Sequence, residues 1–311
     1  SILAVNYFLN YNSVNGLNYL TLGSNIFVVS ILVYYYNTTK TNIIYDLSKI
    51  LKFIIIHATL NFLISNFFFS SFTIWVKDSI EFDTISLLNL FFVNSTESFS
   101  QIKRNCGLFW EPGILQIYIN LYVFFKMFLF KDMKFTTLVF CFALVLTTFS
   151  TTGLILFLTL CTVFYWHKIK KLSSIMPIVI FMVFSLTILK QNIEDKFQGE
   201  NKNSSQARIY DAVIGSILIF ESPLYGIGYN SIKSNNIYSD NESYSLAVNI
   251  ANMTYIQERG NTNSIIMNFV YWGIPLGTLV ILLLIKQTLV SEKKTLFFII
   301  ILIFCSTEPL L

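Results

Sequence analysis

The chain has 311 residues, of which 54% are hydrophobic and only 12% are charged, and its formal net charge is +4. Charge this sparse, combined with this much apolar side chain, lies outside the range of soluble domains. The four cysteines show no C-x-x-C spacing, which gives no indication of a disulfide framework or a cysteine metal site. We therefore expect an integral membrane protein.

Eight apolar runs have the length, or nearly the length, of membrane spans. A helix needs roughly 17–25 mostly apolar residues to cross a hydrocarbon core of about 30 Å, and the sequence has no alternating pattern of the β-barrel kind. The expected fold is an all-α polytopic membrane protein, with residues 1–311 forming a single membrane domain. The first ten residues resemble the tail of another span, which suggests that upstream spans are missing. The eight spans are expected at 16–36, 53–74, 114–130, 135–150, 152–166, 173–190, 264–285 and 295–311.

Two shorter features inside this layout have a specific interpretation. The fourth and fifth runs are individually short, and the polar sequence TTFSTTG at 147–153 is the natural hairpin between them. His57 lies within a predicted span. We expect it to be a packed or hydrogen-bonded interior residue, although an ionisable group at membrane depth is also a candidate for function.

The charges of the connecting segments predict which side of the membrane each one faces. Two long segments, 75–113 and 190–263, have a net charge of −4, with thirteen acidic residues against nine basic ones. The remaining connections have eleven lysines against three acidic residues, and their net charge is +8. Because lysine density marks the cytoplasmic side, 75–113 becomes the first periplasmic loop and 190–263 the large periplasmic loop. The cytoplasmic segments are then 37–52, 131–134, 167–172 and 286–294.

All three arginines of the chain, Arg104, Arg208 and Arg259, fall on the side expected to be periplasmic. A guanidinium offers a fixed fork of donors that suits phosphate, whereas lysine is the usual marker of topology. The outer face is therefore expected to bind an anion.

Within the large loop, the sequence 207–230 predicts an amphipathic helix on the membrane surface or across the outer mouth of the bundle. Pro223, Gly226 and Gly228 are its stop signals. Arg208 stands at the predicted start of this helix, where the helix dipole is already positive. An anion bound between the two would explain that position, and the alternative is a solvated loop arginine.

Three blocks in this order resemble the O-antigen polymerase and O-antigen ligase family of bacterial envelope glycosyltransferases. They are R-x-x-G-x-F-W-E-P-G at 104–113, R-x-Y followed by SPLYGIGYN at 208–230, and NTNSIIMNFVYWGIPLG at 261–277. Each block alone is weak. The ordered set, with the large loop between the sixth and seventh predicted spans, covers about residues 85–280.

The resemblance implies a multi-pass transferase of the bacterial inner membrane with its active site facing the periplasm. It would transfer a growing undecaprenyl-pyrophosphate-linked glycan onto a lipid-linked repeat unit, with no cofactor, metal or nucleotide donor. The implied partners are an undecaprenyl-pyrophosphate-linked oligosaccharide, membrane lipid and a chain-length regulator, with no nucleic acid. Ligases of the family have a histidine just before the asparagine that opens the span after the large loop, and Thr262 stands there in this chain. A polymerase is therefore favoured over a ligase.

In such a reaction Arg104 and Arg208 would stabilise the charge that develops on the pyrophosphate leaving group. Glu111 would be the general base for the acceptor hydroxyl, or else a helix cap that pairs with Arg104. The other expected substrate contacts are stacking on sugar faces by Trp110 and Tyr210, a third cation at Arg259, and an amide at Asn263 that either binds the acceptor or holds the loop backbone.

Two other functions compete with the transferase. A flippase or transporter of a lipid-linked sugar would also need arginines and aromatic residues on a polytopic bundle. Transporters, however, place ionisable groups near the bilayer midplane, often in repeated halves, and here the functional-looking residues gather in loops. A purely structural scaffold would leave the placement of the arginines unexplained.

Overall fold

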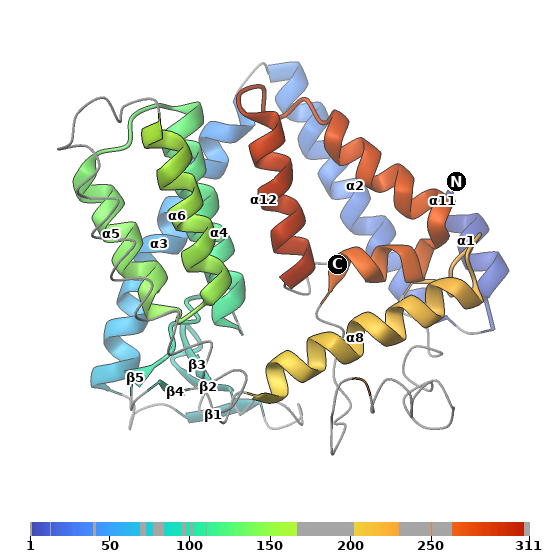
Figure 1. Cartoon of the computed structure of the whole chain (residues 1–311), viewed down its shortest axis with the longest axis horizontal. Helices are drawn as coiled ribbons and strands as arrows, with labels where there is room; N and C mark the ends of the chain where they lie inside the picture. The colour runs from blue at the N-terminus through green and yellow to red at the C-terminus, as the bar shows by residue number, and fades with distance from the viewer. Residues whose placement is uncertain are drawn as a thin grey trace. The chain divides into compact units, whose positions relative to one another are not determined.

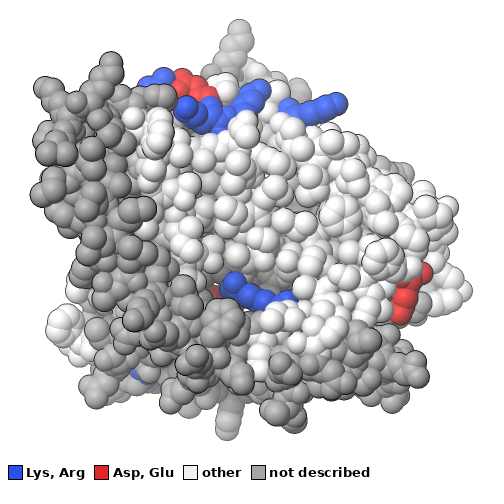
Figure 2. Space-filling model, viewed as in Figure 1, with Lys and Arg blue, Asp and Glu red and all other residues white. Residues whose placement is uncertain are grey.

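Helices make up most of this computed structural model, and four of them are long and apolar enough to cross a membrane (Figure 1). These are α2 (Gly16–Thr39), α3 (Ile43–Phe67), the continuous helix Pro112–Leu129, and α11 (Ser264–Lys286). The face shown in Figure 2 has few charged side chains over its described area, as a lipid-facing surface requires. The chain is a helical membrane protein. The structure describes residues 2–12, 14–39, 42–68, 73–76, 84–94, 98–99, 102–109, 111–166, 202–229, 250 and 263–307.

The remaining apolar helices of the described part are too short to span a bilayer unaided. They are α5 (Phe135–Thr147), α6 (Thr151–Tyr165) and α12 (Lys294–Thr307). At about 1.5 Å per residue, these helices extend only about 20–22 Å, against a hydrocarbon core of about 30 Å. Helices therefore occupy every predicted span except 173–190, which lies outside the described residues, but their lengths do not support a count of eight spans.

Two local expectations were wrong. Segment 37–52 is not a connection, because α3 begins at Ile43. Asp46, Lys49 and Lys52 lie on the first turns of that helix, where Lys49 Nζ is 2.9 Å from Asp46 Oδ1. The span expected at 53–74 is also too long, because α3 ends at Phe67 and a strand begins at Thr73. The described residues include five short strands beside the helices. β1 (Thr73–Val76), β2 (Thr84–Leu87) and β3 (Phe91–Asn94) form an antiparallel sheet, and β4 (Ser98–Phe99) pairs with β5 (Ile102–Lys103).

The chain folds as two compact units. Unit 1 comprises Ser1–Ile43, Lys202–Leu289 and Lys294–Leu311, and unit 2 comprises Ile44–Asn201 and Val290–Lys293. Unit 1 is therefore assembled from segments far apart in the sequence.

Unit 2 is built around α4 (Pro112–Phe124), which continues into the π-helical turn η2 (Phe125–Leu129) and packs against α5 and α6. Phe124, Phe125 and Phe157 are fully buried between these helices. Gly153 lets α6 approach α4 closely, because a Cβ at that position would lie 2.8 Å from Cβ of Gln116. Phe128 contacts Phe164 further along the same two helices. Since 116 pairs with 153 and 128 with 164, α4 and α6 run parallel and begin at the same end of unit 2.

In unit 1, helix α8 (Lys202–Glu221) packs on the first half of α11. Tyr210, Ile214 and Leu218, spaced one helical turn apart, form its buried face and pack with Met267 and Val270. The predicted amphipathic helix is thus confirmed. It ends at Glu221, two residues before the predicted stop signal Pro223, and it begins earlier than predicted.

Helix α11 is divided by Gly273, whose backbone lies in the left-handed region with φ 75° and ψ 172°. Pro275 follows, and the two halves turn sharply, as the ribbon in Figure 1 shows. Asn268 Nδ2 donates to Gly277 O at 3.1 Å across the bend.

Candidate functional site

The segment with Arg104 is fixed to the hairpin between α5 and α6. Arg104 Nε donates to Thr148 O at 3.1 Å, and Asn105 N donates to Thr147 O at 3.0 Å. The hairpin has the predicted position. Phe149 has a positive φ of 49°, and Ser150 Oγ accepts a hydrogen bond from Gly153 N at 3.2 Å as the N-cap of α6. Two polar sequences that were predicted separately therefore form one end of unit 2.

Asn105 holds this segment in place, although no sequence pattern marks it as a site residue. Its buried side chain donates through Nδ2 to Ala58 O at 3.0 Å and to Thr147 Oγ1 at 3.1 Å. Its Oδ1 accepts from Gly107 N at 3.1 Å. Gly107 has a φ of 60°, and a Cβ there would lie 3.1 Å from Leu115 Cδ1. The glycine of the R-x-x-G block is thus required by the turn that Asn105 closes.

Glu111 occupies the N-cap position of α4, with an extended backbone (φ −137°, ψ 136°) and Pro112 in the first turn. Its side chain makes no capping hydrogen bond. The predicted position is therefore confirmed, whereas the capping bond is absent. The N-termini of α4 and α6 and the Arg104 segment therefore lie at the same end of unit 2.

The predicted position of Arg208 at the start of its helix was wrong. The helix begins at Lys202, so the half-buried Arg208 lies beyond the first turn, where the effect of the helix dipole has largely decayed. The sequence interpretation failed because the polar residues at 202–206 gave no apolar periodicity to mark the earlier start.

Other predicted site residues have structural surroundings of their own. Tyr210 is only 3% exposed and lies in the α8–α11 core, where its ring is covered by protein. Asn263 is the N-cap of α11, and its Oδ1 accepts from Ile265 N at 3.1 Å and from Ile266 N at 3.0 Å. Asn263 was expected either to bind the acceptor or to hold the loop backbone, and these two hydrogen bonds show it holding backbone. Trp110 and Arg259 lie outside the described residues.

The sequence SPLYGIG and the break in α11 form one tightly packed element of unit 1. Ile227 N donates to Val270 O at 2.9 Å, and Ile274 N donates to Pro223 O at 2.7 Å. Gly226 and Gly273 both have positive φ, and a Cβ on Gly226 would lie 2.5 Å from the Tyr271 carbonyl. The glycines in the sequence blocks at 208–230 and 261–277 thus allow two backbones to touch.

Asn6 ties this element to α1 (Ile2–Asn10) and α2, a region that appeared to be merely hydrophobic in the sequence. Its Nδ2 donates to Tyr225 O at 2.8 Å and to Tyr271 O at 3.2 Å. Its Oδ1 accepts from Tyr19 Oη, which in turn accepts from Tyr229 N at 2.8 Å. We call Asn6, Tyr19 and the carbonyls of Tyr225 and Tyr271 the Asn6 clasp.

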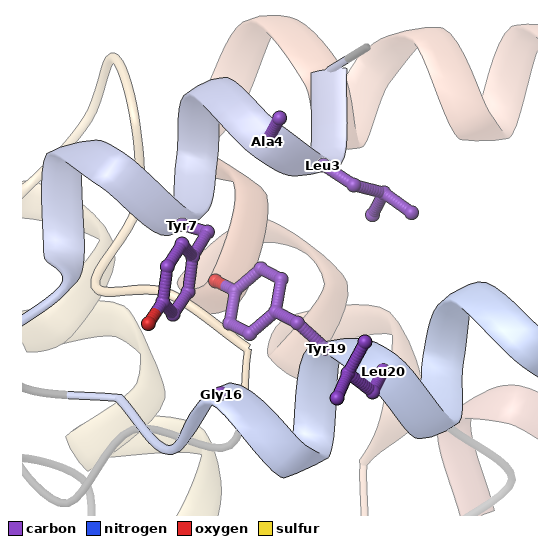
Figure 3. Close-up of a pocket in the computed structure, with 6 residues that line it drawn as sticks. All are labelled: Leu3, Ala4, Tyr7, Gly16, Tyr19 and Leu20. Carbon is purple, nitrogen blue, oxygen red and sulfur yellow. The ribbon is translucent and has the colours of Figure 1, made fainter.

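Two cavities flank α1 within unit 1. Figure 3 shows the first, of about 350 Å³, where Tyr7 of α1 and Tyr19 of α2 present their rings to each other. The second, of about 400 Å³, lies on the side of the α11 break. Both have mainly apolar linings. The first is lined by Leu3, Ala4, Tyr7, Gly16, Tyr19 and Leu20, and the second by Val5, Asn6, Leu9, Leu224, Tyr225, Pro275 and Leu276.

No family model, no curated protein and no solved structure matches this chain.

Proposed function

We propose that the protein is a polysaccharide polymerase of the bacterial inner membrane that transfers a growing undecaprenyl-pyrophosphate-linked glycan onto a lipid-linked repeat unit. The observation that carries this proposal is the hydrogen bond from Arg104 Nε to Thr148 O. It fixes the guanidinium plane at the end of unit 2 where α4 and α6 both begin. A fixed cation beside two helix N-termini is suited to a pyrophosphate.

In the proposed reaction the acceptor hydroxyl oxygen attacks the anomeric carbon of the donor glycan, and the bond from that carbon to the pyrophosphate oxygen breaks. The electron pair leaves with the lipid pyrophosphate, whose growing charge Arg104 stabilises. The hydroxyl proton passes to the Glu111 carboxylate, which is not engaged as a helix cap. Arg208 and Arg259 are the further proposed cations, and Trp110 is the further proposed aromatic substrate contact.

The proposal includes the layout expected from charge: eight spans, with 75–113 and 190–263 in the periplasm. What supports it is the grouping of the Arg104 segment, Glu111 and the 147–150 hairpin at one end of unit 2. The lysine-rich connection 131–134 leads into the opposite end of α5, where Lys131 Nζ lies 2.9 Å from Glu292 Oε2. An O-antigen ligase would use the same end of unit 2 and remains the alternative within the family.

One observation favours a second function, the flipping of a lipid-linked sugar. Transporters often place their substrates at broken membrane helices, and α11 is broken at Gly273. The break here is occupied by the chain itself, because Pro223 O, Ile227 N and the Asn6 clasp satisfy the backbone groups around it. The transferase is therefore preferred.

The test is polymer formation by the purified full-length protein in liposomes that contain lipid-linked repeat units and lipid A core. Glycans longer than one repeat on the lipid carrier, lost in Arg104→Ala but kept in Lys131→Ala, are the expected result. Transfer to lipid A core instead would identify a ligase. Movement of repeat units across the bilayer without any chain growth would identify a flippase and overturn the proposal.

A further inference from the structure

A β-strand edge is attached to the side of α3. Strand β3 pairs with β2 along one edge, and its other edge faces α3. His57 Nε2 is 2.8 Å from Leu90 O, just before the strand. Asn61 Nδ2 donates to Phe92 O at 3.0 Å, and Phe92 N donates to Asn61 Oδ1 at 2.9 Å. His57 and Asn61 are one helical turn apart on α3, and their hydrogen-bond partners, Leu90 and Phe92, are two residues apart along the strand. The spacing of side chains on one face of the helix therefore matches the spacing of outward-facing backbone groups on the strand.

The attachment lies along the apolar part of α3 rather than beyond its end. Helix α3 is long and apolar enough to span a membrane, and it ends at Phe67. His57 lies about 15 Å before that end at about 1.5 Å per residue, a distance well inside a hydrocarbon core of about 30 Å. The His57 ring also stacks on Phe91, with 5.4 Å between ring centroids.

The tip of the β2–β3 hairpin has apolar residues where a soluble turn has polar ones. Leu88 and Asn89 have positive φ values of 56° and 55°, a conformation in which glycine, asparagine and aspartate are preferred. Leu88 is nevertheless a leucine and is 79% exposed, and Leu90 is 57% exposed. The exposed Phe53, Ile56 and Leu60 of α3 continue the same kind of surface.

We propose that the β2–β3 hairpin, residues 84–94, is embedded in the membrane alongside α3, with Leu88 and Leu90 among the acyl chains of the lipid. The depth follows from the His57 and Asn61 contacts, and the apolar tip identifies hydrocarbon as its surroundings. This part of 75–113 is then not an aqueous loop. The inference does not depend on the enzymatic proposal.

Embedding a strand is costly unless its backbone groups are paired, because hydrocarbon offers no partners. The β3 edge meets this condition through His57 and Asn61, and the tip through the bond from Leu90 N to Leu87 O at 3.1 Å. The proposal thereby explains why a candidate span contains a histidine and a buried asparagine at adjacent turns. Their role is to supply the hydrogen bonds that a second strand would otherwise provide.

The test measures collision of a spin label with reagents of opposite solubility. The four native cysteines are replaced, and the full chain with Leu88→Cys is labelled and reconstituted in phosphatidylethanolamine–phosphatidylglycerol vesicles. Ile56→Cys on α3 is the lipid control and Ser291→Cys the aqueous control. Leu88 should match Ile56, with high accessibility to oxygen and low accessibility to a nickel chelate. Accessibility to nickel as high as at Ser291, or low accessibility to both reagents, would overturn the proposal.

A second measurement does not require the cysteine-free background. Leu88→Trp is reconstituted in vesicles of the same headgroups with brominated acyl chains, and its fluorescence is compared with that of the parent chain. The fluorescence added by the new tryptophan should be at least halved by bromine. Unchanged intensity in brominated and plain vesicles would reject an embedded tip.

Discussion

Asn105 shows how a single amide supports the candidate site. Its side chain joins the Arg104 segment to α3 through Ala58 and to the α5–α6 hairpin through Thr147, and it closes the turn at Gly107. Arg104 can therefore be held in place by a neighbour that never contacts the substrate.

Replacing Asn105 with leucine should destabilise unit 2. The Gly107 N–H and the Ala58 carbonyl would lose their partner in a buried setting, and each such loss costs about 1–3 kcal/mol. Thermal unfolding in detergent should show a clearly lower midpoint, together with reduced polymer formation. Asn37→Leu on the exposed side of α2 is the matched control and should leave both unchanged. An unaltered midpoint in Asn105→Leu would contradict the role given to this residue.

Arg104→Lys should lose polymer formation nearly as completely as Arg104→Ala. A lysine ammonium cannot bond Thr148 O and also present a two-pronged fork to pyrophosphate. Polymer ladders are compared at equal protein level, and Lys131→Ala, which removes an exposed ion pair, is the control. If Arg104→Lys forms as much polymer as the wild type, Arg104 contributes only its positive charge and not a two-pronged hydrogen bond.

Glu111→Gln tests the general-base role, because an amide cannot take up the proton of the acceptor hydroxyl. The rate of polymer formation should fall by about 10²–10⁴-fold if the carboxylate is the general base. Rates are measured with purified variants across a range of pH and normalised to folded protein. Activity within about threefold of wild type, roughly 0.65 kcal/mol in barrier height, would be too high for that role.

At the scale of elements, the break in α11 is the feature most dependent on backbone contact. Gly273 has a φ of 75°, and a Cβ there would lie 2.6 Å from the Leu224 carbonyl carbon and oxygen. The bend is thus determined by a neighbouring loop as well as by Pro275.

Gly273→Ala should destabilise the protein by more than about 1 kcal/mol, since alanine at positive φ is strained and the added methyl meets backbone. Gly23→Ala is the matched control, because that glycine lies within α2 with nothing within 4 Å of an added Cβ. There the substitution should be stabilising by about 0.5–1 kcal/mol. Equal unfolding midpoints for the two variants would mean that the break is not held as described.

Sequence patterns predicted most elements and few of the contacts between them. The long apolar runs indicated the helices, and TTFSTTG indicated the hairpin, because these signals are local. The start of α3 was missed because Asp46, Lys49 and Lys52 look like a loop by charge, although two of them pair on the helix surface. Asn6, Asn105 and the strand edge at Phe92 could not be predicted, because each depends on partners remote in sequence.

At the scale of the whole molecule, the proposed orientation rests on the lysine distribution. Single cysteines replacing Ser204 and Ser291 should react differently with an impermeant thiol reagent in cells with a permeabilised outer membrane. Position 204 should be labelled, and position 291 should be labelled only after the inner membrane is opened. Single cysteines at Ser243 and Ser173, outside the described residues, extend the comparison to each side. Labelling of 291 alone would reverse the orientation and move the proposed site to the cytoplasmic face.

The Asn6 clasp also constrains the order of biosynthesis. Asn6 and the Tyr271 carbonyl it binds are 265 residues apart. At about 5–20 residues per second, a ribosome needs about 13–53 s between them. Unit 2, made almost entirely in that interval, can fold while Asn6 is bonded to Tyr19 alone and its Nδ2 group still lacks the carbonyl of Tyr271. Completion of unit 1 is therefore a late event.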